Sequence, residues 1–115
     1  MIEIRRNNRR RFARAHVDIP VRTEDVGGAT VVHAMDDSEW GLRFHTLAGT
    51  PVARRGEVYV EFTLPDDTQP IRASGCIASD REVRVTRMTS IRFTLLRDED
   101  AARIRGYVER TRQAA

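Results

Sequence analysis

Arginines are concentrated near the start of the chain, at Arg9, Arg10, Arg11 and Arg14. Each guanidinium is a planar cation that can donate two parallel hydrogen bonds to a phosphate or to the O6 and N7 edge of guanine, and it can stack on a purine. Residues 1–14 also contain Arg5 and Arg6 but only one acidic residue, Glu3. This composition favours an anionic partner. A basic arm of this kind is also compatible with a solvated segment or with non-specific phosphate contacts to nucleic acid.

A second polar group, which begins 22 residues after Arg14, consists of Asp36, Ser38 and Gly41. An ionised carboxylate only accepts hydrogen bonds, whereas a hydroxyl both donates and accepts them. Glycine allows a positive φ or a close approach of the backbone to a ligand. These residue types suit a binding loop, but they also form ordinary turns between strands, with the glycine at a bulge. The group alone leaves both interpretations open.

Residues that would serve an enzyme or a metal site are sparse. Cys76 is the only cysteine, which excludes an internal disulfide, and it is predicted to be a small buried hydrophobe in a strand. The histidines His16, His33 and His45 lack the spacing of a zinc site and are predicted to be ordinary strand residues. With no catalytic triad and no phosphate-cradling glycine loop, the sequence predicts a non-enzyme without a metal or cofactor.

At 115 residues the chain has the length of one domain. Hydrophobic residues make up 40% and charged residues 32%, which is typical of an ordinary folded protein. All 20 basic residues are arginine, and the formal net charge is +3. No apolar run approaches the ~20 residues of a membrane-spanning helix, and the charged start does not resemble a secretory signal. We therefore expect a cytoplasmic protein without a membrane span.

Alternating apolar and polar residues predict short strands after a basic arm at residues 1–14. The expected strands lie at residues 17–23, 29–35, 42–46, 58–64, 71–79, 82–86 and 91–96. Pro20 places the first strand at a sheet edge or beside a bulge, and Gly75 indicates a bulge in the fifth. Residues 36–41 are predicted to form a loop.

The hydrophobic period then changes, and an apolar stripe at helical spacing predicts a helix over residues 98–112. The stripe consists of Ala101, Ile104, Tyr107 and Val108. Asp98 can cap this helix, while Gly106 in its middle should cost about 1 kcal/mol relative to alanine. The predicted fold class is all-β with one C-terminal helix, a small six- or seven-stranded antiparallel β-barrel. Residues 15–112 are expected to form this single domain.

The two polar groups, in this order and with a strand between them, resemble the paired motifs of the PilZ domain, a bacterial receptor domain for the second messenger cyclic di-GMP. The family motifs RRxxxR and [D/N]xSxxG match Arg9-Arg10-x-x-x-Arg14 and Asp36-x-Ser38-x-x-Gly41. The resemblance covers nearly the whole chain, from about residue 9 to about residue 110. It implies a small β-barrel with a C-terminal helix.

Two positions depart from the family pattern, and one register is ambiguous. Trp40 stands before the motif glycine, where the family usually has a small or polar residue, and Ser90 precedes the closing strand, where glycine is frequent. The arginine pattern also fits residues 5–10. The later register is preferred because Arg14 ends three residues before the strand predicted to start at Val17.

The resemblance implies a receptor of cyclic di-GMP rather than an enzyme. The residues implied to bind the ligand are Arg9, Arg10, Arg14, Asp36, Ser38 and Gly41, with Arg11 and Trp40 as further candidates. Arg9 ahead of Arg10 is implied to favour two ligand molecules per chain. Ordering of the arm would relay binding to an effector protein, which could be a flagellar, pilus, polysaccharide-synthesis or regulatory component.

Two other functions stay open at this point. Some PilZ-like domains act as protein adaptors that do not bind the nucleotide, although those usually lack the arginines that this chain keeps. A small basic barrel could instead bind RNA or single-stranded DNA. Such a barrel needs aromatic side chains for base stacking, and Phe44, Tyr59 and Phe62 form no obvious platform, so nucleic acid is the less favoured partner.

Overall fold

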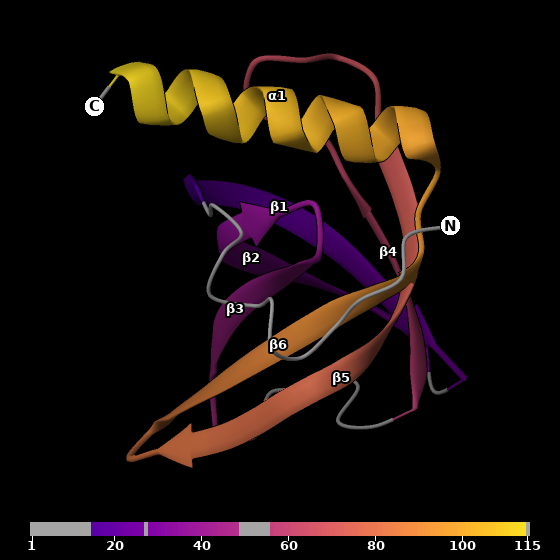
Figure 1. Cartoon of the computed structure of the whole chain (residues 1–115). Coiled ribbons are helices and arrows are strands. Elements are labelled where there is room, and N and C mark those ends of the chain that lie inside the picture. Colours follow the sequence, from indigo (N-terminus) through magenta and orange to yellow (C-terminus); the bar gives the residue numbers. More distant parts are fainter. Residues whose placement is uncertain (1–14, 27, 49–55, 115) are drawn as a thin grey trace.

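The computed structural model describes residues 15–26, 28–48 and 56–114, so the predicted arm at residues 1–14 lies outside the described ranges. The elements are β1 (Ala15–Asp25), β2 (Gly28–Ser38), β3 (Gly41–Leu47), β4 (Glu57–Phe62), β5 (Ile71–Val83), β6 (Thr86–Leu95) and α1 (Asp98–Ala114). The strands pair antiparallel in a closed barrel of order β1-β2-β3-β6-β5-β4 (Figure 1). The predicted fold class is confirmed, with six strands in the described ranges.

Apolar side chains on the inner face of each strand fill the barrel. In β4, Val58, Val60 and Phe62 are buried, whereas Tyr59 between them is exposed. Successive side chains of a strand point to opposite faces, so this alternation fixes which face of β4 meets the core. Across the core, the rings of Phe62 and Phe93 are stacked with their centroids 6.3 Å apart.

A short seam between β1 and β4 closes the barrel. It pairs residues 22–24 of β1 with residues 59–61 of β4. Pro20 lies just before this seam and beside a register shift between His16 and Ile19 in the β1–β2 ladder. Its position agrees with the prediction, since a residue without an N–H is tolerated where a ladder hydrogen bond is not required.

The longest hairpin joins β5 to β6, and its turn was not predicted. The turn consists of Arg84, which has a φ of 60°, and Val85. A separate strand at residues 82–86 is therefore wrong, because those residues belong to the two arms of the hairpin and to the turn between them. The segment contains no glycine, proline or asparagine, so the usual sequence signal of a tight turn is missing.

A register shift between Ser74 and Gly75 confirms the predicted bulge in β5. Gly75 also permits close packing, because a Cβ there would lie 2.6 Å from the Arg92 carbonyl oxygen of β6. The neighbouring Cys76 is only half-buried, so its predicted burial in the core is wrong. Its sulfur instead accepts a hydrogen bond from Arg92 Nη2 over 3.3 Å.

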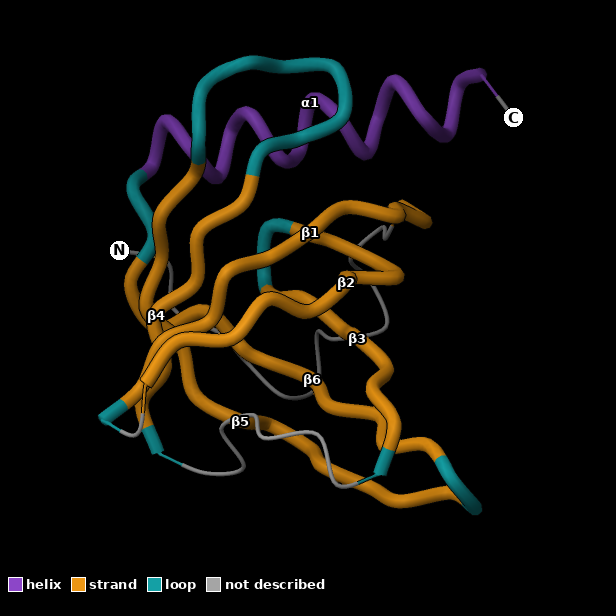
Figure 2. The backbone as a smooth tube through the Cα atoms, turned by 180° about the vertical axis from the view of Figure 1, so that it is seen from behind, coloured by secondary structure: helices purple, strands orange, loops and turns teal. Residues whose placement is uncertain are grey.

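Helix α1 lies across one end of the barrel, beside the loop that joins β4 to β5 (Figures 1 and 2). The prediction of a helix over 98–112 is confirmed. Its inward stripe includes Ala101, Ile104 and Val108, all buried, with Tyr107 packed partly against the same core. Across the described residues, no helix is both long enough and apolar enough to cross a membrane.

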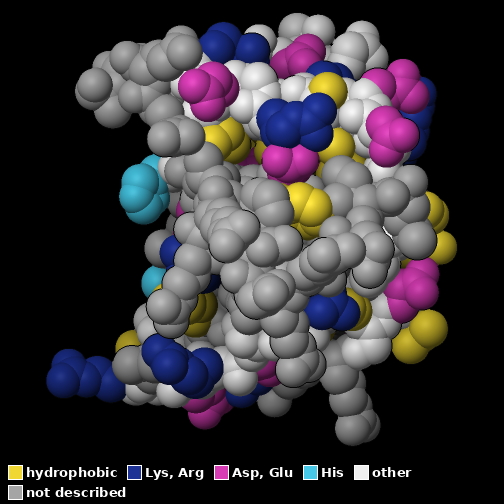
Figure 3. Space-filling model, in the orientation of Figure 1, with side chains coloured by type: hydrophobic (Ala, Val, Ile, Leu, Met, Phe, Trp, Pro, Cys, Tyr) yellow, Lys and Arg dark blue, Asp and Glu magenta, His cyan; other side chains and the backbone are white. Residues whose placement is uncertain are grey.

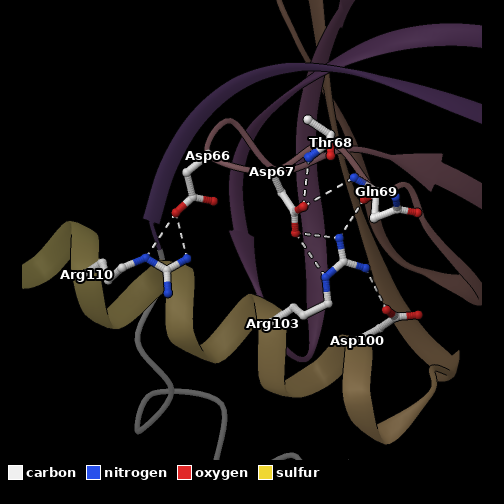
Figure 4. A network of polar contacts seen from close by, with 7 residues as sticks. All are labelled: Asp66, Asp67, Thr68, Gln69, Asp100, Arg103 and Arg110. Carbon is white, nitrogen blue, oxygen red and sulfur yellow. Dashed lines mark hydrogen bonds and ion pairs between the residues drawn. The ribbon is translucent and has the colours of Figure 1, made fainter.

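Arg103 fastens α1 to the β4–β5 loop, as Figure 4 shows. Its Nε and Nη2 donate to Asp67 Oδ2 over 3.1 and 2.6 Å, and Nη2 also donates to the Gln69 carbonyl oxygen over 2.6 Å. Its Nη1 donates to Asp100 Oδ1 over 2.9 Å. About two turns further on, Arg110 Nε and Nη2 donate to Asp66 Oδ2 over 3.0 and 2.6 Å.

The same contacts shift the ionisation of Asp67. The hydrogen bonds from Arg103, followed by those from the backbone N–H groups of Gln69 and Thr68, lower the pKa of Asp67 from 3.8 to about 2. Reciprocally, the hydrogen bond to Asp67 raises the pKa of Arg103. The loop and the helix are therefore held together by a pair that stays charged over the whole neutral and mildly acidic range.

Candidate functional site

The second motif lies at the end of the β2–β3 hairpin. Asp36 and Ser38 are the last part of β2, Gly41 is the first residue of β3, and the turn between them is only residues 39–40. The predicted loop over residues 36–41 is thus wrong in its extent. The ladder opposite β3 continues to the pair Ser38 and Gly41, and this pairing overrides the turn-like composition of the segment.

A bulge in β2 changes which face of the sheet the side chains at its end point to. Ala34 is opposite Phe44 and Asp36 is opposite Arg43, so β2 has one more residue than β3 between these pairs. A one-residue insertion exchanges the two faces of a strand beyond it. Beyond the bulge Asp36 shares a face with Arg43, while the buried Asp37 stands opposite the core residue Leu42.

The Asp36 carboxylate is buried and paired. Arg43 Nε donates to Asp36 Oδ2 over 2.9 Å, and Arg43 Nη2 donates to the same oxygen. The side chain of Asp36 is 3% exposed and that of Arg43 is 39% exposed. A buried carboxylate without a cation nearby would be costly, and Arg43 supplies that cation.

Ser38 shapes the turn. Its Oγ accepts a hydrogen bond from the Trp40 N–H over 3.2 Å, and the Trp40 carbonyl accepts one from the Phe93 N–H of β6 over 2.9 Å. Ser38 is 1% exposed. Its hydroxyl therefore already has the structural role of a side-chain-stabilised turn.

Gly41 is required by packing rather than by an unusual φ. The glycines with positive φ in the described ranges are Gly28 and Gly56, so the alternative of a positive φ at Gly41 is wrong. A Cβ at Gly41 would lie only 2.0 Å from the Ile91 carbonyl oxygen. The close approach that the structure shows at this glycine is to the backbone of β6, and the predicted approach of Gly41 to a ligand stays a prediction.

The turn is also connected to the helix. Arg105 Nη1 of α1 donates to Glu39 Oε2 over 2.9 Å, and the Glu39 side chain is only 16% exposed. The hairpin end that carries the second motif therefore contacts both β6, through Trp40, and α1, through Glu39. A ligand that moved this turn would act on both elements.

The structure brings Asp36, Ser38, Trp40 and Gly41 together at one hairpin end. The other predicted site residues, Arg9, Arg10, Arg11 and Arg14, lie outside the described residues. The first described residues lie beside the hairpin, because β1 begins with Ala15 opposite Asp37 and His16 opposite Asp36. The arginine motif thus ends one residue before a strand that borders the second motif.

Arg43 is a residue of this site that sequence reasoning missed. A signal was available, since a two-residue turn at 39–40 places residue 38 opposite 41 and residue 36 opposite 43 by simple counting. The histidines behave as predicted: His16, His33 and His45 lie in separate strands. Within the described ranges, no group of three or more His, Cys, Asp or Glu side chains is arranged to hold a metal ion.

One comparison with known proteins identifies the family of the chain. The family described as PilZ domain matches residues 8–110 of the chain. No curated protein sequence matches it. Among solved structures, the chain is similar to the Bacillus subtilis inhibitor of motility (MotI/DgrA), with a TM-score of 0.78 and 14% identity over 98% of this chain and 53% of that chain.

Two further structures share the fold. The PilZ domain of CeSA from a cellulose-synthesizing bacterium gives a TM-score of 0.53 at 16% identity, covering 84% of this chain and 91% of that chain. The Borreliella burgdorferi PlzA protein in complex with c-di-GMP gives 0.58 at 7% identity, covering 88% and 52%. The chain therefore spans about half the length of MotI/DgrA and of PlzA.

Proposed function

Because the chain belongs to the PilZ domain family, we propose that it is a receptor that binds cyclic di-GMP between its arginine motif and the end of the β2–β3 hairpin. The observation that carries the proposal is the start of β1: His16 pairs with Asp36, so the arm that precedes β1 joins the barrel beside the second motif. The structural relative PlzA was solved in complex with this ligand.

The two motifs supply complementary chemistry for such a ligand, which carries two phosphates and two guanines. Arg9, Arg10 and Arg14 offer cationic forks for phosphate or for the O6 and N7 edge of guanine, with Arg11 as an additional cation. The carboxylate of Asp36 provides acceptors for the N1–H and N2–H donors of guanine, which no arginine can provide. Ser38 and Gly41 hold the turn, and Trp40 either offers a ring on which a base stacks or crowds the site.

In the proposed mechanism, the arm at residues 1–14 closes over the barrel when the dianionic ligand neutralises its guanidiniums. Arg9 beside Arg10 favours two stacked ligand molecules per chain. The closed arm then presents a changed surface to an effector protein in the cytoplasm. Hydrogen exchange tests this step: residues 5–14 should become protected on ligand addition, and equal exchange with and without ligand would exclude closure.

Calorimetric titration of cyclic di-GMP tests binding itself. The wild-type chain should bind saturably, and both Arg10→Ala and Asp36→Asn should weaken binding by tenfold or more, since each removes hydrogen bonds to a charged group worth about 1.5–3 kcal/mol. Arg72→Ala is the matched control, because Arg72 also pairs across strands with a carboxylate, Glu61, but on β4 and β5. It should bind as the wild type does.

A PilZ-like adaptor that does not bind the nucleotide is the second candidate. It is favoured by the internal roles of the second motif, since Asp36 pairs with Arg43, Ser38 stabilises the turn and Gly41 packs against β6. Absence of binding heat from a folded wild-type chain would leave this alternative in place of the receptor, and its protein partner would then have to be found.

Nucleic acid is less well supported. Arginines and carboxylates lie side by side near the helix on the described part of the face in Figure 3, and a phosphate backbone would be better matched by a continuous basic stripe. A nucleic acid complex should also weaken steeply with added salt and be indifferent to cyclic di-GMP.

A further inference from the structure

Arg43 belongs to neither motif, yet it is the residue that lies directly across the ladder from Asp36. Two of its donors, Nε and Nη2, converge on one carboxylate oxygen, Asp36 Oδ2. A guanidinium holds its donors in a rigid planar fork, so two bonds to one oxygen restrict how the carboxylate can turn. Arg43 therefore fixes an orientation as well as neutralising a charge.

The two side chains differ in exposure. Asp36 is 3% exposed and Arg43 is 39% exposed, so the Arg43 side chain reaches the surface whereas the Asp36 carboxylate is buried beside it. The register places Ser90 of β6 on the other side of Arg43. Any ligand group that reaches Asp36 must therefore approach beside a positioned cation, within a surface built from three paired strands.

Building on the proposed function, we propose that Arg43 is the positioning residue for guanine recognition: by holding Asp36 Oδ2, it sets the carboxylate that accepts the N1–H and N2–H of the base. Guanine differs from hypoxanthine only by its N2 amino group. A fixed carboxylate distinguishes these bases strongly, whereas one that rotates re-forms its hydrogen bonds to either and distinguishes them weakly.

The experiment compares cyclic di-GMP with its inosine analogue, cyclic di-IMP, by calorimetry in the wild-type chain and in Arg43→Lys. The wild type should prefer cyclic di-GMP by about ten- to a hundredfold, the range expected for one hydrogen bond to a charged group. Lysine retains the cation but not the fork. In Arg43→Lys the preference should therefore fall to about threefold or less, while the affinity for cyclic di-IMP changes little.

Arg72→Lys is the control, since Arg72 and Glu61 form a cross-strand pair of 3.4 Å on the outer face of β4 and β5. It should leave the preference unchanged. A purely structural role of Arg43 predicts that both ligands lose affinity by the same factor and the preference persists, which would overturn the inference while leaving the receptor intact. A wild-type chain that binds neither ligand would overturn the proposed function and the inference together.

Arg43→Gln covers the case in which the lysine variant does not fold. Glutamine retains a neutral donor opposite Asp36 but no fork and no charge. Thermal unfolding first establishes which variant is folded, and the folded one is titrated. Loss of the preference in that variant supports the positioning role, and a preference equal to that of the wild type overturns it.

Discussion

Gly41 belongs to the second motif, and the packing of β3 against β6 requires a glycine at this position. Its Cβ position would lie 2.0 Å from the Ile91 carbonyl oxygen, and the next nearest atoms are also backbone of β6. Backbone cannot turn away as a flexible side chain can, so β3 and β6 would have to separate. A glycine at this position is therefore needed whether or not a ligand binds.

We predict that Gly41→Ala lowers the free energy of unfolding by about 3 kcal/mol, the upper range for overpacking a well-packed site. Urea denaturation measures this loss. Gly106→Ala in α1 is the control, because its Cβ would be 3.1 Å from the flexible end of Arg110 and helix propensity favours alanine by up to about 1 kcal/mol. If Gly41→Ala were as stable as Gly106→Ala, the close approach of β6 would not constrain this position.

Asp67 gives a prediction about pH. Its pKa is lowered to about 2 in the folded chain, so its contribution to stability is complete above the unfolded pKa of 3.8 and disappears as the pH falls through about 2. The stability advantage of the wild type over Asp67→Asn should therefore shrink between pH 5 and pH 2. Denaturation at several pH values measures it, and a constant difference would contradict the assignment.

Site residues could be predicted from the sequence where they lie close together along the chain. Asp36, Ser38 and Gly41 lie within six residues and were identified as one group. Arg43 was missed because its role depends on the register of the β2–β3 hairpin, and the turn of that hairpin is shorter than the loop predicted over residues 36–41. The structural reason for Gly41 depends on β6, which is about 50 residues away along the chain, and no local pattern contains that contact.

At the level of elements, α1 is held by contacts of very different quality. Arg103 reaches Asp67, Gln69 and Asp100 at once and is 27% exposed. Arg97, by contrast, pairs with Glu99 where both side chains are about two-thirds exposed. Exposed pairs of the second kind usually contribute little to stability.

We therefore expect Arg103→Met to lower the free energy of unfolding by about 1–2 kcal/mol, because several hydrogen bonds to a partly buried cation are lost together. Arg97→Met should stay within about 0.5 kcal/mol of the wild type. Urea denaturation of the two variants provides the comparison. Equal effects would mean that apolar contacts alone hold the helix against the barrel.

Elements with a strong period were predicted well, and those defined by turns were not. The stripe from Ala101 to Val108 located the helix, and the alternation of Val58, Val60 and Phe62 located β4. The turn at Arg84 and Val85 could not be predicted from the sequence, because its conformation is imposed by the paired strands rather than by a favourable turn residue. The position of this turn is therefore set by the pairing of β5 with β6 and not by the composition of the segment.

For the whole molecule, ligand binding and folding are linked if the proposed function holds. A ligand that binds only the folded chain at a hundred times its dissociation constant should add about 2.7 kcal/mol to the free energy of unfolding. Thermal unfolding with and without cyclic di-GMP measures the effect, which Arg10→Ala should reduce by about 1.3 kcal/mol or more at the same concentration, since its binding is at least tenfold weaker. Stabilisation of Arg10→Ala equal to that of the wild type would indicate a site without this arginine.

The short seam between β1 and β4 has a consequence for association with other chains. Proteins with an open sheet can accept a strand from a partner along an unpaired edge, which gives affinity through main-chain hydrogen bonds. Residues 22–24 of β1 pair with residues 59–61 of β4, so within the described residues the sheet closes on itself and no strand has its whole edge unpaired. The unpaired edge is confined to strand ends such as residues 77–83 of β5, which lie beyond the β4–β5 ladder, so strand-by-strand association has no full-length edge strand to extend.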